Sequence, residues 1–237
     1  MRSVAARHYG LTQIAIVVAA VDAYELLRRA LRPNWPLAVE HAREVASLER
    51  LAHLAWEAPL QHAFLDVPDV VRLLNVFYLA GHFVVTGIFF CWLYRRSQPA
   101  FRRFRDAFLA ATAVALAVHA AFPTAPPRLA GVGLEDTLRR LSGIDVGSLS
   151  NPVAAIPSLH AGWALGVGIG LVRHARSRRW RAAGIAYPIL VVVTIVVTGN
   201  HFVLDAIAGA AIVAPALLVV ELAPRRGVEQ PGSSPGS

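Results

Sequence analysis

The sequence AIPSLHA, from Ala155 to Ala161, and the sequence TGNHFVLD, from Thr198 to Asp205, determine how the rest of this chain is interpreted. Each places a histidine at the mouth of a hydrophobic stretch, and the second adds a carboxylate four residues after its histidine. Because residues i and i+4 lie on the same face of a helix, His201 and Asp205 can touch. A carboxylate beside an imidazole fixes the tautomer of the ring and raises its basicity. The pair therefore predicts a histidine that acts as a nucleophile or a general base.

The composition predicts a membrane protein. Of the 237 residues, 56% are hydrophobic and the mean hydropathy is +0.50, which is too apolar for an ordinary soluble domain. All 23 basic residues are arginine, so no lysine is available for phosphate binding or Schiff-base chemistry. The single cysteine, Cys91, excludes a disulfide within the chain, and its apolar surroundings in the sequence disfavour thiol catalysis. In a membrane protein the net charge of +8 indicates topology and lipid contact, so we expect membrane lipids and no nucleic acid as partners.

The hydropathy pattern predicts an all-α, polytopic membrane bundle with about six transmembrane helices. Each apolar stretch approaches the ~20 residues needed to cross a ~30 Å hydrocarbon core. The predicted helices cover residues 11–31, 73–94, 105–122, 156–173, 182–199 and 202–222. We assign residues 1–222 to one catalytic membrane domain and the low-complexity residues 223–237 to a disordered cytoplasmic tail. Segment 33–70 mixes acidic with apolar residues, which predicts one or two amphipathic helices on the outer surface.

The distribution of arginine among the loops predicts the orientation. Segments 94–105 and 173–181 carry five arginines each, whereas the longer segment 123–155 carries three. The positive-inside rule makes the arginine-rich side cytoplasmic. We therefore expect a multi-pass protein of the cell membrane in which Arg128, His160 and His201 face the outside.

Three polar stretches are predicted to meet on that outer side. In FPTAPPRL, residues 122–129, the prolines stiffen a non-helical exit from the third predicted helix and direct Arg128, whose planar guanidinium suits two phosphate oxygens. In IPSLHA, Pro157 suits the first helical turn, where the free N–H groups favour an anion. Ser158 adds a hydroxyl donor beside His160. With the GNHFVLD stretch, these segments predict one phosphate-sized site near the membrane interface.

Asn75, Tyr78 and His82 form a further candidate set. Their spacings of i, i+3 and i+7 place them on one face of the second predicted helix, in its outer half. On that face they can line the same cavity and contact a phosphate or a polar inositol. Hydrogen bonds that hold neighbouring helices together are an equally good interpretation of these three side chains.

For several other glycines and histidines we expect helix packing or solvent exposure and no role in catalysis. Gly162, Gly166 and Gly170 have the spacing of small residues that is typical of close helix packing. His119 lacks a local partner in the sequence and is expected to pack rather than react. The histidines that belong to no motif and are expected to be solvated are His8, His41, His53, His62 and His174.

These motifs resemble those of the type-2 phosphatidic acid phosphatase superfamily. The resemblance covers most of the chain, from about Asn75 to Gly209. That family has an arginine-containing stretch, a PSxH stretch and an HxxxD stretch, which are matched here by Arg128, by residues 157–160 and by residues 201–205. The similarity implies a membrane-embedded helical enzyme that acts on phosphate esters of lipids.

The resemblance also implies a role for each matching residue. It implies that His201 is the nucleophile that becomes phosphohistidine, and that Asp205 orients it. It implies that His160 protonates the leaving oxygen. Arg128 and Ser158 are, by the same resemblance, ligands of the phosphate.

The sequence departs from the family pattern around the phosphate. The family has a lysine seven positions before the arginine and a proline after it, and Ala121 and Leu129 stand there. It has Ser-Arg seven and six positions before the last histidine, where this chain has Thr194 and Ile195. Asn200 and backbone N–H groups are candidates to replace the two missing cations. APPR, PSLH and TGNHFVLD are instead similar to the branch that contains inositol phosphorylceramide synthases, which transfers phospho-groups between lipids and alcohols.

We therefore expect a metal-independent lipid phosphatase or inositolphosphotransferase. Its substrate is a lipid phosphate or phospholipid, and a transferase adds a polyol acceptor; the sequence leaves both reactions open. No cofactor or metal is expected, because the carboxylates do not cluster and Arg128 with backbone dipoles supplies positive charge. Two alternatives remain. One is a catalytically inert lipid-binding or transport protein, and the other is a polytopic metalloenzyme using His82, His160 and His201.

Overall fold

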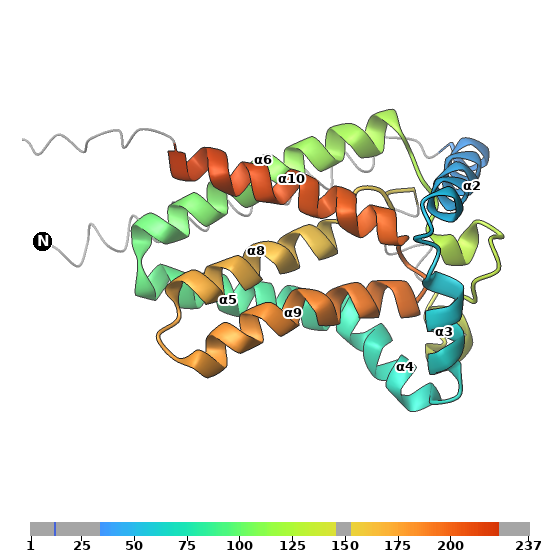
Figure 1. Cartoon of the computed structure of the whole chain (residues 1–237), viewed down its shortest axis with the longest axis horizontal. Coiled ribbons are helices and arrows are strands. Elements are labelled where there is room, and N and C mark those ends of the chain that lie inside the picture. Colours follow the sequence, from blue (N-terminus) through green and yellow to red (C-terminus); the bar gives the residue numbers. More distant parts are fainter. Residues whose placement is uncertain (1–11, 13–33, 146–152, 223–237) are drawn as a thin grey trace, which may run out of the picture.

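The computed structural model describes residue 12, residues 34–145 and residues 153–222. These residues form a bundle of helices, and the only pairing of extended backbone within them is an isolated bridge between Thr124 and Ala154 (Figure 1). The predicted all-α class is therefore confirmed. The predicted first helix, apart from residue 12, and the predicted tail lie outside the described residues.

Four helices of the described chain are long and apolar enough to cross a membrane. They are the continuous helix Pro68–Arg96, α6 (Gln98–Ala121), α9 (Arg178–Val197) and α10 (Val203–Leu222). The first comprises α4 (Pro68–Val76), a π-helical turn η1 (Phe77–Gly81) and α5 (His82–Arg96). A fifth predicted span corresponds to α8 (Leu159–His174), which at 16 residues is shorter than these four.

Two helices begin at other residues than predicted, because a serine caps the start of each. Ser97 caps α6 by accepting a first-turn N–H, so α6 begins at Gln98 and includes arginines that we predicted in a loop. Ser158 caps α8 in the same way, so this helix begins at residue 159 rather than 156. Pro157 consequently precedes the helix, and its predicted place in the first turn was wrong. Hydropathy does not register a cap, because the cap depends on one hydrogen bond rather than on apolar content.

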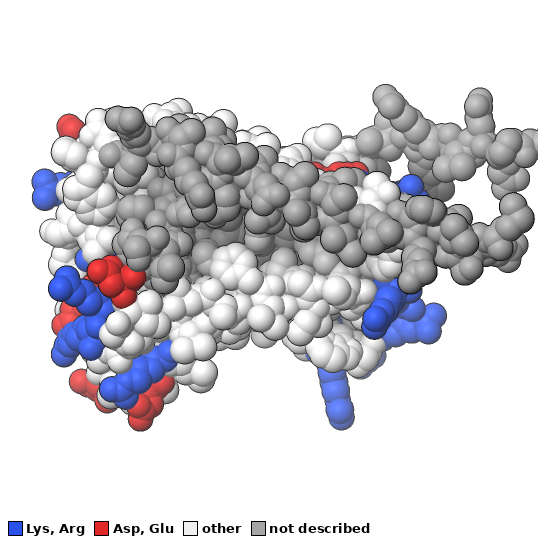
Figure 2. All heavy atoms as spheres, turned by 180° about the vertical axis from the view of Figure 1, so that it is seen from behind, with Lys and Arg blue, Asp and Glu red and all other residues white. Residues whose placement is uncertain are grey.

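Two short helices cover the end of the bundle where α10 begins. They are α2 (Trp35–Leu51) and α3 (Glu57–Leu65), and they confirm the prediction of helices in segment 33–70 (Figure 1). The arginine-rich segments 94–105 and 173–181, where α5 meets α6 and α8 meets α9, lie at the opposite end. On the part of the surface that grey atoms leave visible in Figure 2, most charged side chains gather at the two ends, with a band of other residues between them. This distribution fits a multi-pass membrane protein.

Glycines let α8 approach its neighbours closely. A Cβ atom on Gly162 would lie 2.9 Å from the carbonyl oxygen of Gly209 in α10, and one on Gly166 would lie 2.5 Å from the ring of Phe108 in α6. A Cβ on Gly170 would likewise collide with Phe89 of α5. The expected packing role of these three glycines is thus confirmed, and it brings α8 and α10 close enough to share a site.

We expect Gly209→Ala to lower the unfolding temperature in detergent, by an amount equivalent to about 2 kcal/mol. Its Cβ would collide with the backbone carbonyl oxygen of Ser158, and overpacking of this kind costs about 1–3 kcal/mol. The matched control is Gly87→Ala in α5, where a Cβ meets nothing within 4 Å. Equal unfolding temperatures for the two variants would show that α8 and α10 can move apart without cost.

Candidate active site

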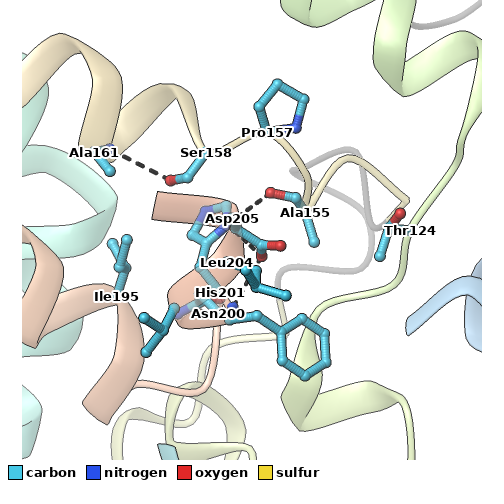
Figure 3. Close-up of polar contacts among 12 residues, drawn as sticks. Thr124, Ala155, Pro157, Ser158, Ala161, Ile195, Asn200, His201, Leu204 and Asp205 are labelled. Atoms are coloured by element: carbon cyan, nitrogen blue, oxygen red, sulfur yellow. Dashed lines mark hydrogen bonds and ion pairs between the residues drawn. The ribbon is translucent and has the colours of Figure 1, made fainter. Parts of the chain in front are cut away.

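The strongest candidate is the imidazole of His201, in the turn between α9 and α10. Its Nδ1 lies 2.9 Å from the carbonyl oxygen of Ala155 and 3.3 Å from Oδ2 of Asp205 (Figure 3). A carbonyl oxygen can only accept, so this bond places the ring proton on Nδ1. Nε2 is then the unprotonated nitrogen, with a lone pair available for reaction. The expected contact with Asp205 is present, and the Ala155 carbonyl is a second orienting group that the sequence did not indicate.

Asp205 joins the starts of the two helices that carry the histidines. Its carboxylate also accepts the backbone N–H of Phe202 at 2.9 Å, and its backbone carbonyl accepts the N–H of Ser158 at 2.9 Å. The residue is completely buried, and within the described chain its Oδ1 has no hydrogen-bond partner. Asp205 is therefore fixed at both its side chain and its backbone, which in turn fixes the position of His201.

His160 is the second residue of α8, and its ring centroid lies 5.7 Å from that of His201. Tyr78 stacks on it at 4.5 Å between ring centroids, and the Tyr78 backbone carbonyl hydrogen-bonds to it. Tyr78 belongs to the π-helical turn, and such turns inside α-helices are frequent at functional sites because they alter the local hydrogen-bond pattern. The Nε2 of His160 is buried and has no partner among the described residues. The structure thus holds one face of this imidazole and leaves its other nitrogen unpaired.

His82 packs against His160 on the side of α5. The two ring centroids are 5.0 Å apart, and the hydroxyl of Tyr187 hydrogen-bonds to Nδ1 of His82 at 2.9 Å. His82 is 1% exposed, and its Nε2 has no partner within the described chain. Tyr78 and His82 therefore both contact the ring of His160. Tyr187, which holds His82, carried no sequence signal.

Asn75 is not part of this cluster of rings. Its amide donates to the carbonyl oxygen of Thr137 at 3.0 Å and to the hydroxyl of Ser142 at 2.9 Å, both in α7 (Thr137–Ser142). Its own carbonyl accepts the Thr137 hydroxyl at 3.0 Å. Asn75 therefore does not lie with Tyr78 and His82, and its hydrogen bonds instead link α4 to α7.

Arg128 is brought next to the His201 segment through Asn200. Its Nε donates to Oδ1 of Asn200 at 3.0 Å, and its backbone N–H donates to the carbonyl of Gly199 at 2.9 Å. Its Nη1 forms an ion pair with Asp136 at 2.8 Å, and the arginine side chain is 5% exposed. Two predicted phosphate ligands, Arg128 and Asn200, are thus in direct contact. Asp136 was not predicted, and it holds the guanidinium in one orientation.

The start of α8 provides a second set of donors. Ser158 is completely buried, and its hydroxyl oxygen accepts the N–H of Ala161 at 3.3 Å as a helix cap. The first N–H groups of a helix have no acceptor within that helix, and the helix dipole gives them partial positive charge. This end of α8 is therefore suited to an anion, with Ser158 free to donate its hydroxyl proton while it accepts from Ala161.

Two further histidines support the site from outside. His119, at the end of α6, hydrogen-bonds through Nε2 to the carbonyl of Pro157 at 3.1 Å, which fits its expected packing role. His41 hydrogen-bonds through Nδ1 to the carbonyl of Pro123 at 2.8 Å and stacks on Phe122, so its expected solvation was wrong. Both brace the segments that lead into the site. In sequence they are isolated, so the local pattern gives no indication of these partners.

The described residues contain no group of three or more histidine, cysteine, aspartate or glutamate side chains arranged to hold a metal ion. His82, His160 and His201 lie near one another, yet they do not form such a group. The positive charge at the site comes from Arg128 and from the N-terminal end of α8.

Comparison with known proteins identifies one family. The sequence profile described as PAP2 superfamily matches residues 43–219, which is well over half of the chain and includes every candidate residue above. No curated protein and no solved structure gave a significant match.

Proposed function

Because the chain belongs to the PAP2 superfamily, we propose that it is a membrane-embedded lipid phosphatase or phosphotransferase with His201 as its nucleophile. Family membership itself suggests a phosphatase-type activity. The observation that carries the proposal is the pair of contacts at His201 Nδ1, to the Ala155 carbonyl and to Asp205. These contacts direct the lone pair of Nε2 away from its orienting groups, which is what a nucleophilic imidazole requires.

The first step forms a bond between Nε2 of His201 and phosphorus and breaks the bond from phosphorus to the leaving oxygen. The imidazolium that develops is stabilised by Asp205. His160, as the imidazolium, donates the Nε2 proton to the leaving oxygen. Within the described chain this Nε2 has no other partner, which supports its assignment to the leaving group.

The second step breaks the bond between phosphorus and Nε2. Neutral His160 takes a proton from the attacking oxygen, which belongs to water in a phosphatase and to an alcohol in a transferase. Arg128 and the start of α8 stabilise the phosphoryl oxygens during both steps. Arg128 retains Nη2 for this purpose while its Nε and Nη1 contact Asn200 and Asp136.

The sequence motifs support transfer to a polyol, by their similarity to the inositol phosphorylceramide synthase branch. Tyr78 and His82 both lie against the ring of His160, the residue that would exchange a proton with a leaving or accepting alcohol. A polyol hydroxyl suits these side chains, whose aromatic faces and ring nitrogens provide both stacking and hydrogen bonding.

The test is turnover of a panel of lipid phosphates and phospholipids in detergent, with and without inositol, by native protein and by His201→Ala. Release of phosphate without inositol supports a phosphatase, and formation of an inositol-containing product supports a transferase. Saturable lipid binding with no turnover of any panel member would instead favour an inert lipid-binding protein.

For topology, we expect cysteines at the two ends of the bundle to be labelled from opposite sides of the membrane. Glu44→Cys lies at an exposed position of α2, and Arg178→Cys lies at the exposed start of α9, in the arginine-rich segment 173–181; each is made in a Cys91→Ala background. The positive-inside rule predicts labelling of Glu44→Cys in intact cells by a membrane-impermeant thiol reagent, and of Arg178→Cys only after lysis. The reverse pattern would move the proposed chemistry to the cytoplasm.

A further inference from the structure

Three carboxyl groups cover the N-terminus of α10, immediately after His201. Each accepts one of three consecutive backbone N–H groups, and two of the carboxyl groups come from α2 and α3, far away in the sequence. The bonds are Phe202 N to Asp205 Oδ2 at 2.9 Å, Val203 N to Glu57 Oε1 at 2.8 Å and Leu204 N to Glu49 Oε1 at 2.7 Å. This helix therefore obtains most of its N-terminal caps from other helices rather than from a local serine or threonine.

Glu49 and Glu57 are almost inaccessible to water, with 1% and 4% of their surface exposed. Carboxyl groups are rarely buried to this extent unless they are paired, because desolvation of the charged form is costly. The charged groups that act on Glu49 from the elements packed against it are Glu57 of α3 and Asp205 of α10, both acidic. Within the described residues, pairing with a cation is therefore not what holds Glu49 in place.

A proton on Glu49 accounts for this arrangement. Glu57 lies close enough to Glu49 for the two carboxyl groups to repel each other when both are charged, which favours a proton on one of them. Burial together with the neighbouring charges of Glu57 and Asp205, partly offset by the hydrogen bond from Leu204, raises the pKa of Glu49 to about 8. At neutral pH Glu49 is then the neutral partner, and Oε1 still accepts the N–H of Leu204.

We propose that Glu49 and Glu57 are positioning residues, which clamp the first turn of α10 and through it hold His201 and Asp205 against the start of α8. The inference deepens the proposed function, because the residue being positioned is the proposed nucleophile. His201 is two residues before the first clamped N–H, and Asp205 immediately follows the second. A small rotation of this turn would move the imidazole away from the Ala155 carbonyl.

The first test of the clamp compares the enzymatic activity of Glu49→Ala with that of Glu49→Gln at pH 7. Alanine removes the acceptor for Leu204, so we expect kcat to fall about 10–100-fold with KM within about twofold, because the nucleophile is misplaced while the phosphate ligands remain. Glutamine keeps a neutral acceptor of the same shape and should restore kcat to within a few-fold of native. The control is Glu44→Ala, on an exposed position of α2, which should match native protein. A native kcat for Glu49→Ala would overturn the proposal.

Hydrogen exchange gives a readout that does not require activity. The backbone amides of Val203 and Leu204 should be protected in native protein and in Glu49→Gln, and should exchange at least tenfold faster in Glu49→Ala. If native protein forms no phosphoenzyme, the proposed function fails, while this difference in exchange still supports the clamp. Unchanged exchange in Glu49→Ala would overturn the clamp whether or not the protein is active.

The pH dependence of stability provides a further prediction. Glu49 has a higher pKa in the folded protein, about 8, than its ordinary value of 4.5, so the folded state holds this proton more tightly. Its contribution to stability is therefore fully present below about pH 4.5 and is lost as the pH rises through about 8. We expect the unfolding temperature of native protein to fall between pH 6 and pH 9 by several degrees more than that of Glu49→Gln. Parallel curves for the two proteins would show that Glu49 holds no such proton.

Discussion

His201→Ala is expected to abolish turnover, with a loss in kcat of at least about 10⁴-fold, because removal of the proposed covalent nucleophile leaves only binding and electrostatic effects. The direct measurement is the trapping of acid-labile phosphohistidine after brief exposure to a labelled lipid phosphate. Native protein should be labelled and His201→Ala should not. Labelling that persists in the variant would assign the covalent step to another residue.

Asp205→Asn is the informative partner of that variant, and we expect a smaller loss of about 10²-fold. The amide oxygen of asparagine can still accept the N–H of Phe202, and the carbonyl of Ala155 still holds the proton on Nδ1 of His201. What is lost is the negative charge that stabilises the imidazolium. Phosphohistidine should therefore still form, but slowly. If the loss equalled that of His201→Ala, the Ala155 carbonyl would not suffice to orient the ring.

Arg128→Lys is expected to lower kcat/KM by at least about 10²-fold, although it keeps the charge. The guanidinium contacts Asn200 through Nε and Asp136 through Nη1. Because the guanidinium is planar and has five N–H groups, it can make both contacts while its remaining N–H groups face a phosphate. The ammonium group of lysine is a single point of charge and cannot contact Asn200, Asp136 and the phosphate at the same time. The chain has no lysine and lacks the other two cations of the family pattern, which increases its dependence on Arg128.

The matched control for this variant is Arg139→Lys, an exposed arginine of α7 close in sequence to Asp136. It should leave kcat/KM unchanged within about twofold, as is usual for an exposed side chain. Near-native turnover of Arg128→Lys would mean that Arg128 only anchors the chain at the membrane interface.

Sequence alone was sufficient where the governing interaction is local. Apolar content predicted the four helices of the described chain that can cross a membrane, because every backbone polar group must be satisfied within the segment in lipid. The contact between His201 and Asp205 was predicted from their four-residue spacing, although His201 lies in the turn just before α10. The packing role of Gly162 follows from the need for close approach between α8 and α10. The predicted grouping of Arg128 with the histidine motif also held, through the bond of Arg128 to Asn200.

Helical spacing failed for Asn75 because the helix is not regular throughout. The seven-residue separation from His82 assumes an uninterrupted α-helix, but the π-helical turn lies between them. A turn of this kind accommodates about one extra residue, which rotates the following side chains by roughly 100°. Asn75 therefore faces α7, whereas His82 faces His160. Nothing in the residue types of this segment marks the π-helical turn.

The remaining contacts of the site depend on how distant segments cross. The Ala155 carbonyl is 46 positions from His201, and Glu49 is 155 positions from Leu204. A backbone carbonyl has no sequence signature, and a buried glutamate looks the same in sequence as the solvated glutamates around it. Burial and partner are properties of the packed helices, since they arise only when α2, α3 and the start of α8 close around the first turn of α10. The sequence thus determined which residues could carry the chemistry, and the packing determined what holds each of them in place.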